Sequence, residues 1–322
     1  DGYYFDLSTF KDYGKLSGRK AQMADDAITR IDENDKKRNR GDFCLWKLSK
    51  EGEPSWDSEL GAGRPGWHIE DTAITEHYFG PQYDIHGGGQ DLIFPHHEAE
   101  ITQQESASGL KPFVKYWMHV AFLVNKDEKM SKSKGNFTTV HDLLKKYPKE
   151  VLRFYLLSGF YRSPLEFSDK VIKQSEAGVN RINEFAQKIN LADGNGKDNI
   201  EDTVNQAEKN FTEAMDNDFN TPDALASLFE LIRSANPLVN SNILDKKSVE
   251  ATKKFLDNVH AVLGIVSSEK KVIPAEIEKL VAEREVFRTE KNYDESDKLR
   301  DKINSLGYSI DDTIYGPLTN KL

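Results

Sequence analysis

The segment VAFLVNKDEKMSKSKGN, residues 120–136, is the stretch that says most about fold and chemistry in this chain. Its apolar first part, Val120–Val124, predicts a buried strand, so the loop that follows would leave a sheet edge where α/β proteins bind nucleotides. Within that loop, Lys129–Ser133 places two lysines three residues apart beside two serines. Ammonium groups offset phosphate charge and hydroxyls donate hydrogen bonds, which favours a polyphosphate-binding loop over a solvated basic turn.

Composition excludes several classes of protein. The chain has 322 residues, 30% of them charged, and a net charge of −10 at pH 7, which is typical of a helix-rich protein of two or three domains. It contains no apolar run of membrane-spanning length and no signal peptide at its start, so we expect a cytoplasmic location and no membrane partner. The single cysteine, Cys44, excludes a disulfide framework and is expected to be a small buried side chain.

Hydrophobic spacing predicts an α/β part followed by a helical part. Apolar strands alternate with helical segments between about residues 61 and 140, with strands expected at Tyr83–His86 and Val120–Val124, a pattern typical of a parallel sheet. A buried helix is expected next, with apolar side chains at Val151, Leu152, Phe154, Tyr155 and Leu156.

Long helices are predicted over residues 170–268, where apolar residues recur at three- and four-residue spacing. Thr221 is expected to cap one of them, because a proline and an acidic residue follow it in the first turn. Further on, Pro274–Leu306 predicts a charged helical hairpin that ends at Gly307.

Two other segments carry candidate ligand-binding residues. The glycine run Gly87–Gly89 follows a strand, so its backbone could approach a flat or anionic ligand, with Asp91 accepting hydrogen bonds from ribose hydroxyls. His96 and Glu100 are four residues apart after Pro95, which would start a helix and place both side chains on one face, as metal ligands require. Without further context, a glycine triplet indicates only a turn. A His/Glu pair at this spacing indicates a pair of surface residues.

Five segments have distinctive sequences: GRPGWHIE at 63–70, DIHGGGQDLIFPHHEAE at 84–100, KMSKS at 129–133, MDNDFNTP at 215–222 and the closing run 280–316. Together they resemble cysteinyl-tRNA synthetases, which are class I aminoacyl-tRNA synthetases. The resemblance covers nearly the whole chain in order. It implies an α/β fold class: the second half of a class I Rossmann-type nucleotide-binding domain with a connective insertion, followed by an α-helical bundle anticodon-binding region.

The resemblance also implies a division into five parts. They are a partial connective-peptide insertion (1–60), the second half of the Rossmann catalytic domain with the KMSKS loop (61–140), a stem-contact helical region (141–170), a helical-bundle tRNA- and anticodon-binding domain (171–268) and a C-terminal helical hairpin and tail (274–322). The family's His-Ile-Gly-His signature would precede Asp1, and no such tetrapeptide occurs here. We therefore expect a fragment that lacks the N-terminal half of the catalytic domain, counts that half among its partners and is inactive alone.

The implied activity is ATP-dependent formation of cysteinyl-adenylate and transfer of cysteine to tRNA-Cys by a monomer. Lys129 and Lys132 are implied as catalytic residues, and Trp67 and His68 as the lining of the amino-acid pocket. The ATP, with its Mg²⁺, would be bound by Lys132, His86, Gly87, Gly88, Gly89, Asp91, Ser131 and Ser133.

The family also binds zinc through two cysteines, a histidine and a glutamate. His96 and Glu100 match the last two. One family cysteine precedes Asp1 and the other is replaced by Asp71. Because a carboxylate is a harder ligand than a thiolate, zinc held by Asp71, His96 and Glu100 is expected to bind weakly.

Two alternative functions remain open. One is the related ligase that joins cysteine to an amino sugar in mycothiol synthesis, and the other is a non-catalytic RNA-binding fragment. The segment 216–222 and the charged hairpin favour the tRNA ligase. The hairpin's basic side chains would either contact RNA or form ion pairs; they are Arg284, Arg288, Lys291, Lys298, Arg300 and Lys302.

Overall fold

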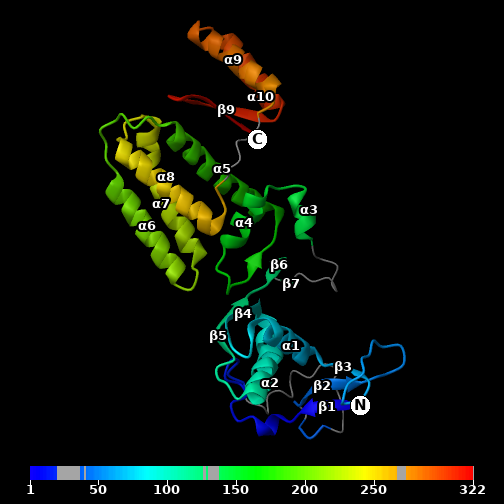
Figure 1. Ribbon diagram of the computed structural model, residues 1–322. Helices are drawn as coiled ribbons and strands as arrows, with labels where there is room; N and C mark the ends of the chain where they lie inside the picture. The colour runs from blue at the N-terminus through cyan, green and yellow to red at the C-terminus, as the bar shows by residue number, and fades with distance from the viewer. Residues whose placement is uncertain (20–36, 40, 126–127, 130–137, 267–272, 322) are drawn as a thin grey trace. The chain divides into compact units, whose positions relative to one another are not determined.

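The computed structural model describes residues 1–19, 37–39, 41–125, 128–129, 138–266 and 273–321. The chain divides into two compact units, residues 1–122 with 162–164, and residues 123–161 with 165–322 (Figure 1). Among the described residues, no helix is both long and apolar enough to cross a membrane.

The first unit begins with a small antiparallel sheet. Its strands are β1 (Gly2–Phe5), β2 (Phe43–Leu48) and β3 (Gly63–Pro65), in the order β1-β2-β3. A short 3-10 turn, η1 (Leu7–Thr9), follows β1. Cys44 in β2 is a free thiol and only 5% exposed, which confirms the expected small buried side chain.

A parallel strand pair forms the centre of this unit. Strand β4 (Tyr83–Gly89) pairs with β5 (Val114–Val120), with Tyr83 opposite Val114 and Gly89 opposite Val120. Helix α1 (Trp67–Phe79) precedes the pair, and η3 (Gln90–Leu92), η4 (Ile93–His97) and α2 (Glu98–Ser108) connect its strands. The predicted strand Tyr83–His86 is confirmed and extends through the glycine run. The predicted buried strand Val120–Val124 is wrong, because β5 ends at Val120, which is 49% exposed, and β6 (Leu123–Asn125) begins three residues later.

Helix α2 is buried although most of its side chains are polar. Glu98, Glu100, Gln103 and Glu105 are each at most 4% exposed. The Glu98 carboxylate accepts backbone N–H groups from Gly14 at 2.9 Å and Ser17 at 2.8 Å. These bonds satisfy the carboxylate and tie the turn after η1 to α2.

The second unit starts with three short strands and two helices. Strand β6 pairs antiparallel with β7 (Glu128–Lys129) and parallel with β8 (Leu165–Glu166). The helices are α3 (Val140–Leu144) and α4 (Lys149–Leu157). In α4 the expected apolar face is buried except at Leu156, which is 52% exposed, so its predicted burial is wrong.

Four long helices lie side by side in the second unit (Figure 1). They are α5 (Asp169–Leu191), α6 (Glu201–Asp216), α7 (Thr221–Asn240) and α8 (Lys246–Leu263). Their shared core includes Phe185, Leu228, Ile232 and Phe255, each at most 1% exposed. The predicted long helices are therefore confirmed. The cap of α7 is Asn220, one residue before the predicted Thr221, because the Asn220 side chain accepts the N–H of Asp223.

The predicted C-terminal helical hairpin is confirmed by α9 (Ala275–Thr289) and α10 (Tyr293–Ser305). Gly307 follows α10 with φ +84°, a left-handed conformation that suits glycine at a helix end. The tail then forms an antiparallel pair, β9 (Tyr308–Thr313) and β10 (Gly316–Lys321), which sequence analysis did not predict. Ile277, Ile303 and Ile310 form the core of this region.

Candidate functional site

The three side chains predicted as metal ligands lie together in the first unit. Asp71 belongs to α1, His96 to η4 and Glu100 to α2. The Nε2 atom of His96 is 2.8 Å from Oδ2 of Asp71 and 3.5 Å from Oε1 of Glu100. One ligand atom of each residue lies within 4.8 Å of the other two. The helical backbone begins at Pro95, directly after the non-helical Phe94, and continues into α2, so the predicted helix start is confirmed.

The carboxylate of Glu100 lacks a hydrogen-bond partner. Its side chain is 1% exposed, and neither carboxylate oxygen is hydrogen-bonded. Burial, with a smaller contribution from the charge of Asp71, raises the pKa of Glu100 to about 8. Burial also lowers the pKa of His96, against the opposing hydrogen bond to Asp71. A buried carboxylate that accepts no hydrogen bond is stabilised by a nearby cation.

The distance between His96 and Glu100 fits ligation of one divalent ion. In a tetrahedral site with metal–ligand bonds of about 2.0–2.2 Å, neighbouring ligand atoms are about 3.3–3.6 Å apart. The 3.5 Å between His96 Nε2 and Glu100 Oε1 matches this spacing, whereas the Asp71–His96 hydrogen bond would lengthen on metal binding. Neither candidate ligand group among the described residues includes Cys44, so the available donors are nitrogen and oxygen.

The residues predicted to line the amino-acid pocket lie beside these ligands. The Nδ1 atom of His68 is 2.7 Å from Nδ1 of His96, and the Trp67 ring stacks on His96 with centroids 4.5 Å apart. The side chain of Gln103 donates to the His68 carbonyl at 2.6 Å, which anchors the start of α1 to α2. Trp67 is 56% exposed, so one aromatic surface next to the candidate metal ligands can contact a small molecule.

A second imidazole group lies on the other side of Glu100. The Nε2 atom of His86 is 3.6 Å from Oε2 of Glu100, and Nδ1 of His97 is 2.8 Å from Nε2 of His119. The Trp117 ring contacts both His86 and His97. Burial, with the nearby His86, lowers the pKa of His97 to about 3, so its imidazole is neutral at pH 7.

Sequence reasoning identified His86 in this group but missed His97 and His119. The two adjacent histidines at 96 and 97 were the available signal, because both precede a helix that carries Glu100. No spacing rule connects His119, which arrives from β5, with the other two. Its position depends on the parallel pairing of β4 and β5.

The glycine run has a structural reason besides ligand access. Gly87–Gly89 form the end of β4, and a Cβ on Gly88 would lie 2.7 Å from Cε1 of His97. A Cβ on Gly89 would lie 2.5 Å from Oδ1 of Asp91, which stands in η3 and is exposed. The run and Asp91 are thus placed together at one end of the parallel strand pair.

The KMSKS segment lies mainly outside the described residues. Ser131, Lys132 and Ser133 are among the residues that the structure does not describe. For Lys129 the backbone alone is described, where β7 pairs it with Val124 of β6. The predicted phosphate-binding roles of these residues therefore stay predictions.

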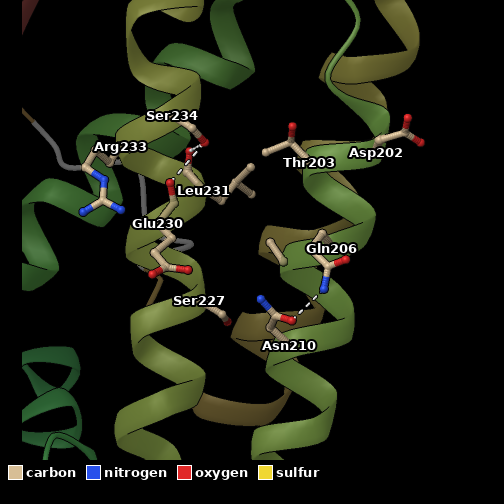
Figure 2. A pocket seen from close by; sticks show the side chains of 10 residues that line it. Asp202, Thr203, Gln206, Asn210, Ser227, Glu230, Leu231, Arg233 and Ser234 are labelled. Atoms are coloured by element: carbon tan, nitrogen blue, oxygen red, sulfur yellow. Dashed lines mark hydrogen bonds between the residues drawn. The ribbon is translucent and has the colours of Figure 1, made fainter.

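A groove runs between α6 and α7 in the second unit (Figure 2). Its volume is about 560 Å³. The carboxylates of Asp202 and Glu230 line it together with Arg233, and Gln206 donates to Asn210 at 2.8 Å. Two carboxylates against one guanidinium disfavour an RNA phosphate here.

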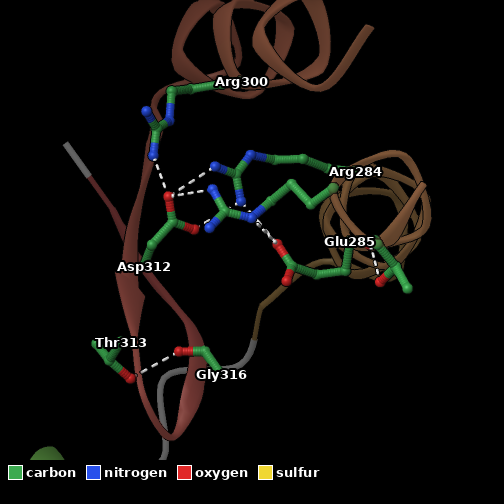
Figure 3. Close-up of polar contacts among 8 residues, drawn as sticks. Arg284, Glu285, Arg300, Asp312, Thr313 and Gly316 are labelled. Atoms are coloured by element: carbon green, nitrogen blue, oxygen red, sulfur yellow. Dashed lines mark hydrogen bonds and ion pairs between the residues drawn. The ribbon is translucent and has the colours of Figure 1, made fainter. Parts of the chain in front are cut away.

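The arginines of the C-terminal region form ion pairs with Asp312 (Figure 3). Arg284 donates to both Asp312 oxygens, at 2.7 and 2.8 Å. Arg288 and Arg300 donate to Oδ2 at 2.8 and 2.5 Å. These three arginines therefore form ion pairs, which was one of the two expected alternatives. Their partner Asp312 was not named by sequence reasoning.

Residues 1–177 match the family described as "tRNA synthetases class I (C) catalytic domain", and residues 210–267 match the DALR domain. The first match covers more than half of the chain. The histidine-rich site therefore lies within the catalytic domain of a class I tRNA synthetase.

The most similar relatives identify the family more narrowly. The chain is 44% identical over 325 residues to Cysteine--tRNA ligase of Clostridioides difficile (strain 630), which covers 97% of this chain and 69% of the relative. It is 43% identical over 321 residues, with the same shares, to Cysteine--tRNA ligase of Carboxydothermus hydrogenoformans. For Cysteine--tRNA ligase of Thermococcus onnurineus (strain NA1), 40% identity over 337 residues covers 100% of this chain and 70% of the relative. The chain belongs to the cysteine–tRNA ligase family, and the predicted resemblance is confirmed.

Proposed function

We propose that this chain takes part in the ATP-dependent activation of cysteine and its transfer to tRNA-Cys. The observation that carries this proposal is the convergence of Asp71, His96 and Glu100 beside Trp67, in a chain of the cysteine–tRNA ligase family. A small thiol-containing amino acid needs such a site, with an aromatic surface next to a polar, buried centre.

The amino-acid pocket is proposed to form around Trp67 and His68. Asp71, His96 and Glu100 would hold a zinc ion, which supplies a Lewis-acid partner for the substrate's sulfur when bound. The 2.7 Å contact between the Nδ1 atoms of His68 and His96 fixes both rings. The half-exposed Trp67 would orient the substrate against them.

ATP is proposed to bind at the end of the parallel strands, in the second half of a Rossmann-type domain. The Gly87–Gly89 backbone and Asp91 would contact adenosine, with His86 beside them. Lys129 and Lys132, with Ser131 and Ser133, would neutralise the charge that develops as pyrophosphate leaves with its Mg²⁺. Positioning and charge stabilisation, rather than covalent catalysis, would then supply the rate enhancement.

The remaining expectations stay predictions. They are the five-part domain division, a monomeric state, a cytoplasmic location and anticodon binding by the helical region. The DALR-domain match at residues 210–267 supports an RNA-related role for that region.

The lysine loop offers the sharpest test of the function. In the native protein, Lys132→Ala should slow cysteine-dependent ATP–pyrophosphate exchange by about 100-fold or more, as loss of one charge-stabilising group typically does. Cysteine binding should change far less, because the lysine is assigned to ATP. The matched control is Lys247→Ala, an exposed lysine of α8, which should leave both unchanged. Equal effects of Lys132→Ala on exchange and on cysteine binding would contradict the assigned role.

The choice of acceptor separates the alternatives. We expect the native protein to charge tRNA-Cys and not an amino sugar, since the DALR-domain match favours an RNA acceptor. Transfer to the amino sugar would identify the mycothiol-type ligase. RNA binding without any pyrophosphate exchange would identify a non-catalytic RNA-binding protein.

A further inference from the structure

Glu100 presents its two carboxylate oxygens to two different imidazoles. Oε1 is 3.5 Å from Nε2 of His96, and Oε2 is 3.6 Å from Nε2 of His86. Both distances exceed a normal hydrogen bond, and neither oxygen has a hydrogen-bond partner. Both match the separation of two ligands on one ion, about 3.3–3.6 Å. Glu100 therefore faces a second set of donors besides Asp71 and His96.

His86, His97 and Glu100 form that second set. One ligand atom of each lies within 4.8 Å of the other two. Each imidazole is oriented through its other nitrogen: the Tyr83 hydroxyl contacts Nδ1 of His86, and His119 contacts Nδ1 of His97 at 2.8 Å. Metal-ligating histidines are typically held in this way, since the second contact fixes the ring and its tautomer.

Gly88 makes room for this arrangement. An ideal Cβ at this position would lie 2.7 Å from Cε1 and 3.1 Å from Nε2 of His97. Any side chain here would displace the imidazole from Glu100. The glycine is therefore needed by the histidine group itself, independently of any nucleotide.

We propose that His86, His97 and Glu100 form a second divalent-cation position, which shares Glu100 with the position at Asp71 and His96. Glu100 bridges the two ions, one through each oxygen, as in two-metal sites whose ions lie about 3.5–4 Å apart. Two neutral imidazoles and a carboxylate oxygen suit zinc and neighbouring first-row divalent ions. The second position rests on the metal centre of the proposed function, but it requires no aminoacylation.

Charge sets the order in which the two positions fill. Once a metal ion has displaced the proton of Glu100, Asp71 and Glu100 together carry two negative charges, which one divalent ion neutralises. The second ion adds buried charge without a further carboxylate, so it binds more weakly and keeps positions open for water or an anion. The Asp71–His96 position therefore fills first, and the His86–His97 position fills at higher metal concentration.

Cobalt titration tests the proposal on the 322-residue chain. After removal of metal by a chelator, Co²⁺ binding is followed by equilibrium dialysis with elemental analysis and by visible absorption. The wild-type chain should bind in two steps. His97→Gln should weaken the second step at least about tenfold and spare the first, whereas Glu100→Gln should weaken both.

Two further variants complete the design. His86→Gln should reproduce the effect of His97→Gln, so the proposal is still tested if either variant fails to fold in circular dichroism and thermal melting. His77→Gln, at an exposed histidine of α1, is the matched control and should keep both steps.

Two outcomes would overturn the proposal. They are a single step in the wild-type chain, or a second step that His97→Gln and His86→Gln leave unchanged. These outcomes are separate from failure of the proposed function, because the Lys132→Ala test of pyrophosphate exchange does not depend on how many ions bind.

Discussion

Asp312 and Glu100 are two carboxylates, each among groups that can carry positive charge, but their oxygens are satisfied differently. Asp312 accepts from Arg284, Arg288 and Arg300, and Arg284, as its largest contributor, holds the pKa of Asp312 below its usual value. Glu100 has no hydrogen-bond partner, and burial raises its pKa to about 8. Arginine side chains of the protein therefore satisfy the oxygens of Asp312, whereas the oxygens of Glu100 accept no hydrogen bond.

The difference indicates which charged cluster binds a ligand. The carboxylate of Asp312 is not buried, and its pairing with the buried guanidinium of Arg284 is explained by stability, even though Nε of Arg284 has no partner of its own. A buried carboxylate whose oxygens accept no hydrogen bond costs stability, and such groups occur where a ligand supplies what the protein lacks. The comparison therefore gives Asp312 a structural role and supports the proposal that Glu100 binds a metal ion.

The largest effect is expected at Asp312. Asp312→Ala should lower the free energy of unfolding of the C-terminal region by about 3 kcal/mol, because the buried guanidinium of Arg284 loses its bidentate carboxylate partner and keeps only Glu285. Denaturant unfolding measures this loss. The matched control is Asp297→Ala, at an exposed residue of α10, which should change little. Equal losses of unfolding free energy from the two variants would show that the ion-pair cluster stabilises the region no more than a single exposed carboxylate does.

Glu100→Gln should act on ligand binding rather than on folding. We expect metal affinity to fall by about 100-fold or more, since loss even of a residue that only supports a ligand costs 10–100-fold. The metal-free chain should keep its unfolding transition, because no hydrogen bond of Glu100 is lost. Isothermal titration with Zn²⁺ and thermal melts measure the two effects. The control is Glu76→Gln, at an exposed residue of α1. Equal losses of metal affinity from the two variants would show that Glu100 is not a metal ligand.

Asp71→Cys sharpens the comparison by changing one donor. In the native protein, a thiolate should raise zinc affinity by about tenfold, because soft ligands favour zinc over harder ions. It should also increase discrimination of cysteine against serine, since a hydroxyl does not reproduce a zinc–thiolate bond. Competition with a zinc chelator and pyrophosphate exchange with each amino acid are the measurements. Unchanged zinc affinity would mean that Asp71 already serves as a full ligand.

The smallest effect on stability is expected from lowering the pH. The pKa of Asp312 lies below its ordinary value of 3.8 in the folded chain, so its pairing stabilises the fold above that pH and is lost as pH falls through the lower folded value. Stability of the C-terminal region should therefore fall on acidification below pH ~4. Unfolding of wild type and Asp312→Asn across this range measures it. A pH dependence that Asp312→Asn leaves intact would assign the acid effect to other groups.

Two helices show how far sequence analysis reaches. Helix α7 was predictable because Leu225, Leu228 and Ile232 recur at helical spacing and are buried in the bundle core. The burial of α2 was not predictable, because Glu98 and Gln103 are polar and form hydrogen bonds to partners distant in the chain. Hydrophobic periodicity detects a buried helix only when its buried face is apolar. It therefore misses a helix such as α2, whose buried side chains are mostly polar.

The candidate site was predictable in part for the same reason. His96, Glu100 and Asp71 could be identified by motif and family resemblance, and the structure brings them together. The contributions of His97 and His119 depend on the pairing of β4 with β5, which no local pattern encodes. The two oxygens of Glu100 facing different imidazoles could be seen only in three dimensions.

X-ray absorption at the zinc edge tests the central claim most directly. The sample is the 322-residue chain reconstituted with one equivalent of Zn²⁺. We predict a shell of nitrogen and oxygen neighbours at about 2.0–2.2 Å with imidazole scattering, which Glu100→Gln should largely abolish. A sulfur neighbour at about 2.3 Å, or an unchanged spectrum from Glu100→Gln, would contradict a metal centre built from Asp71, His96 and Glu100.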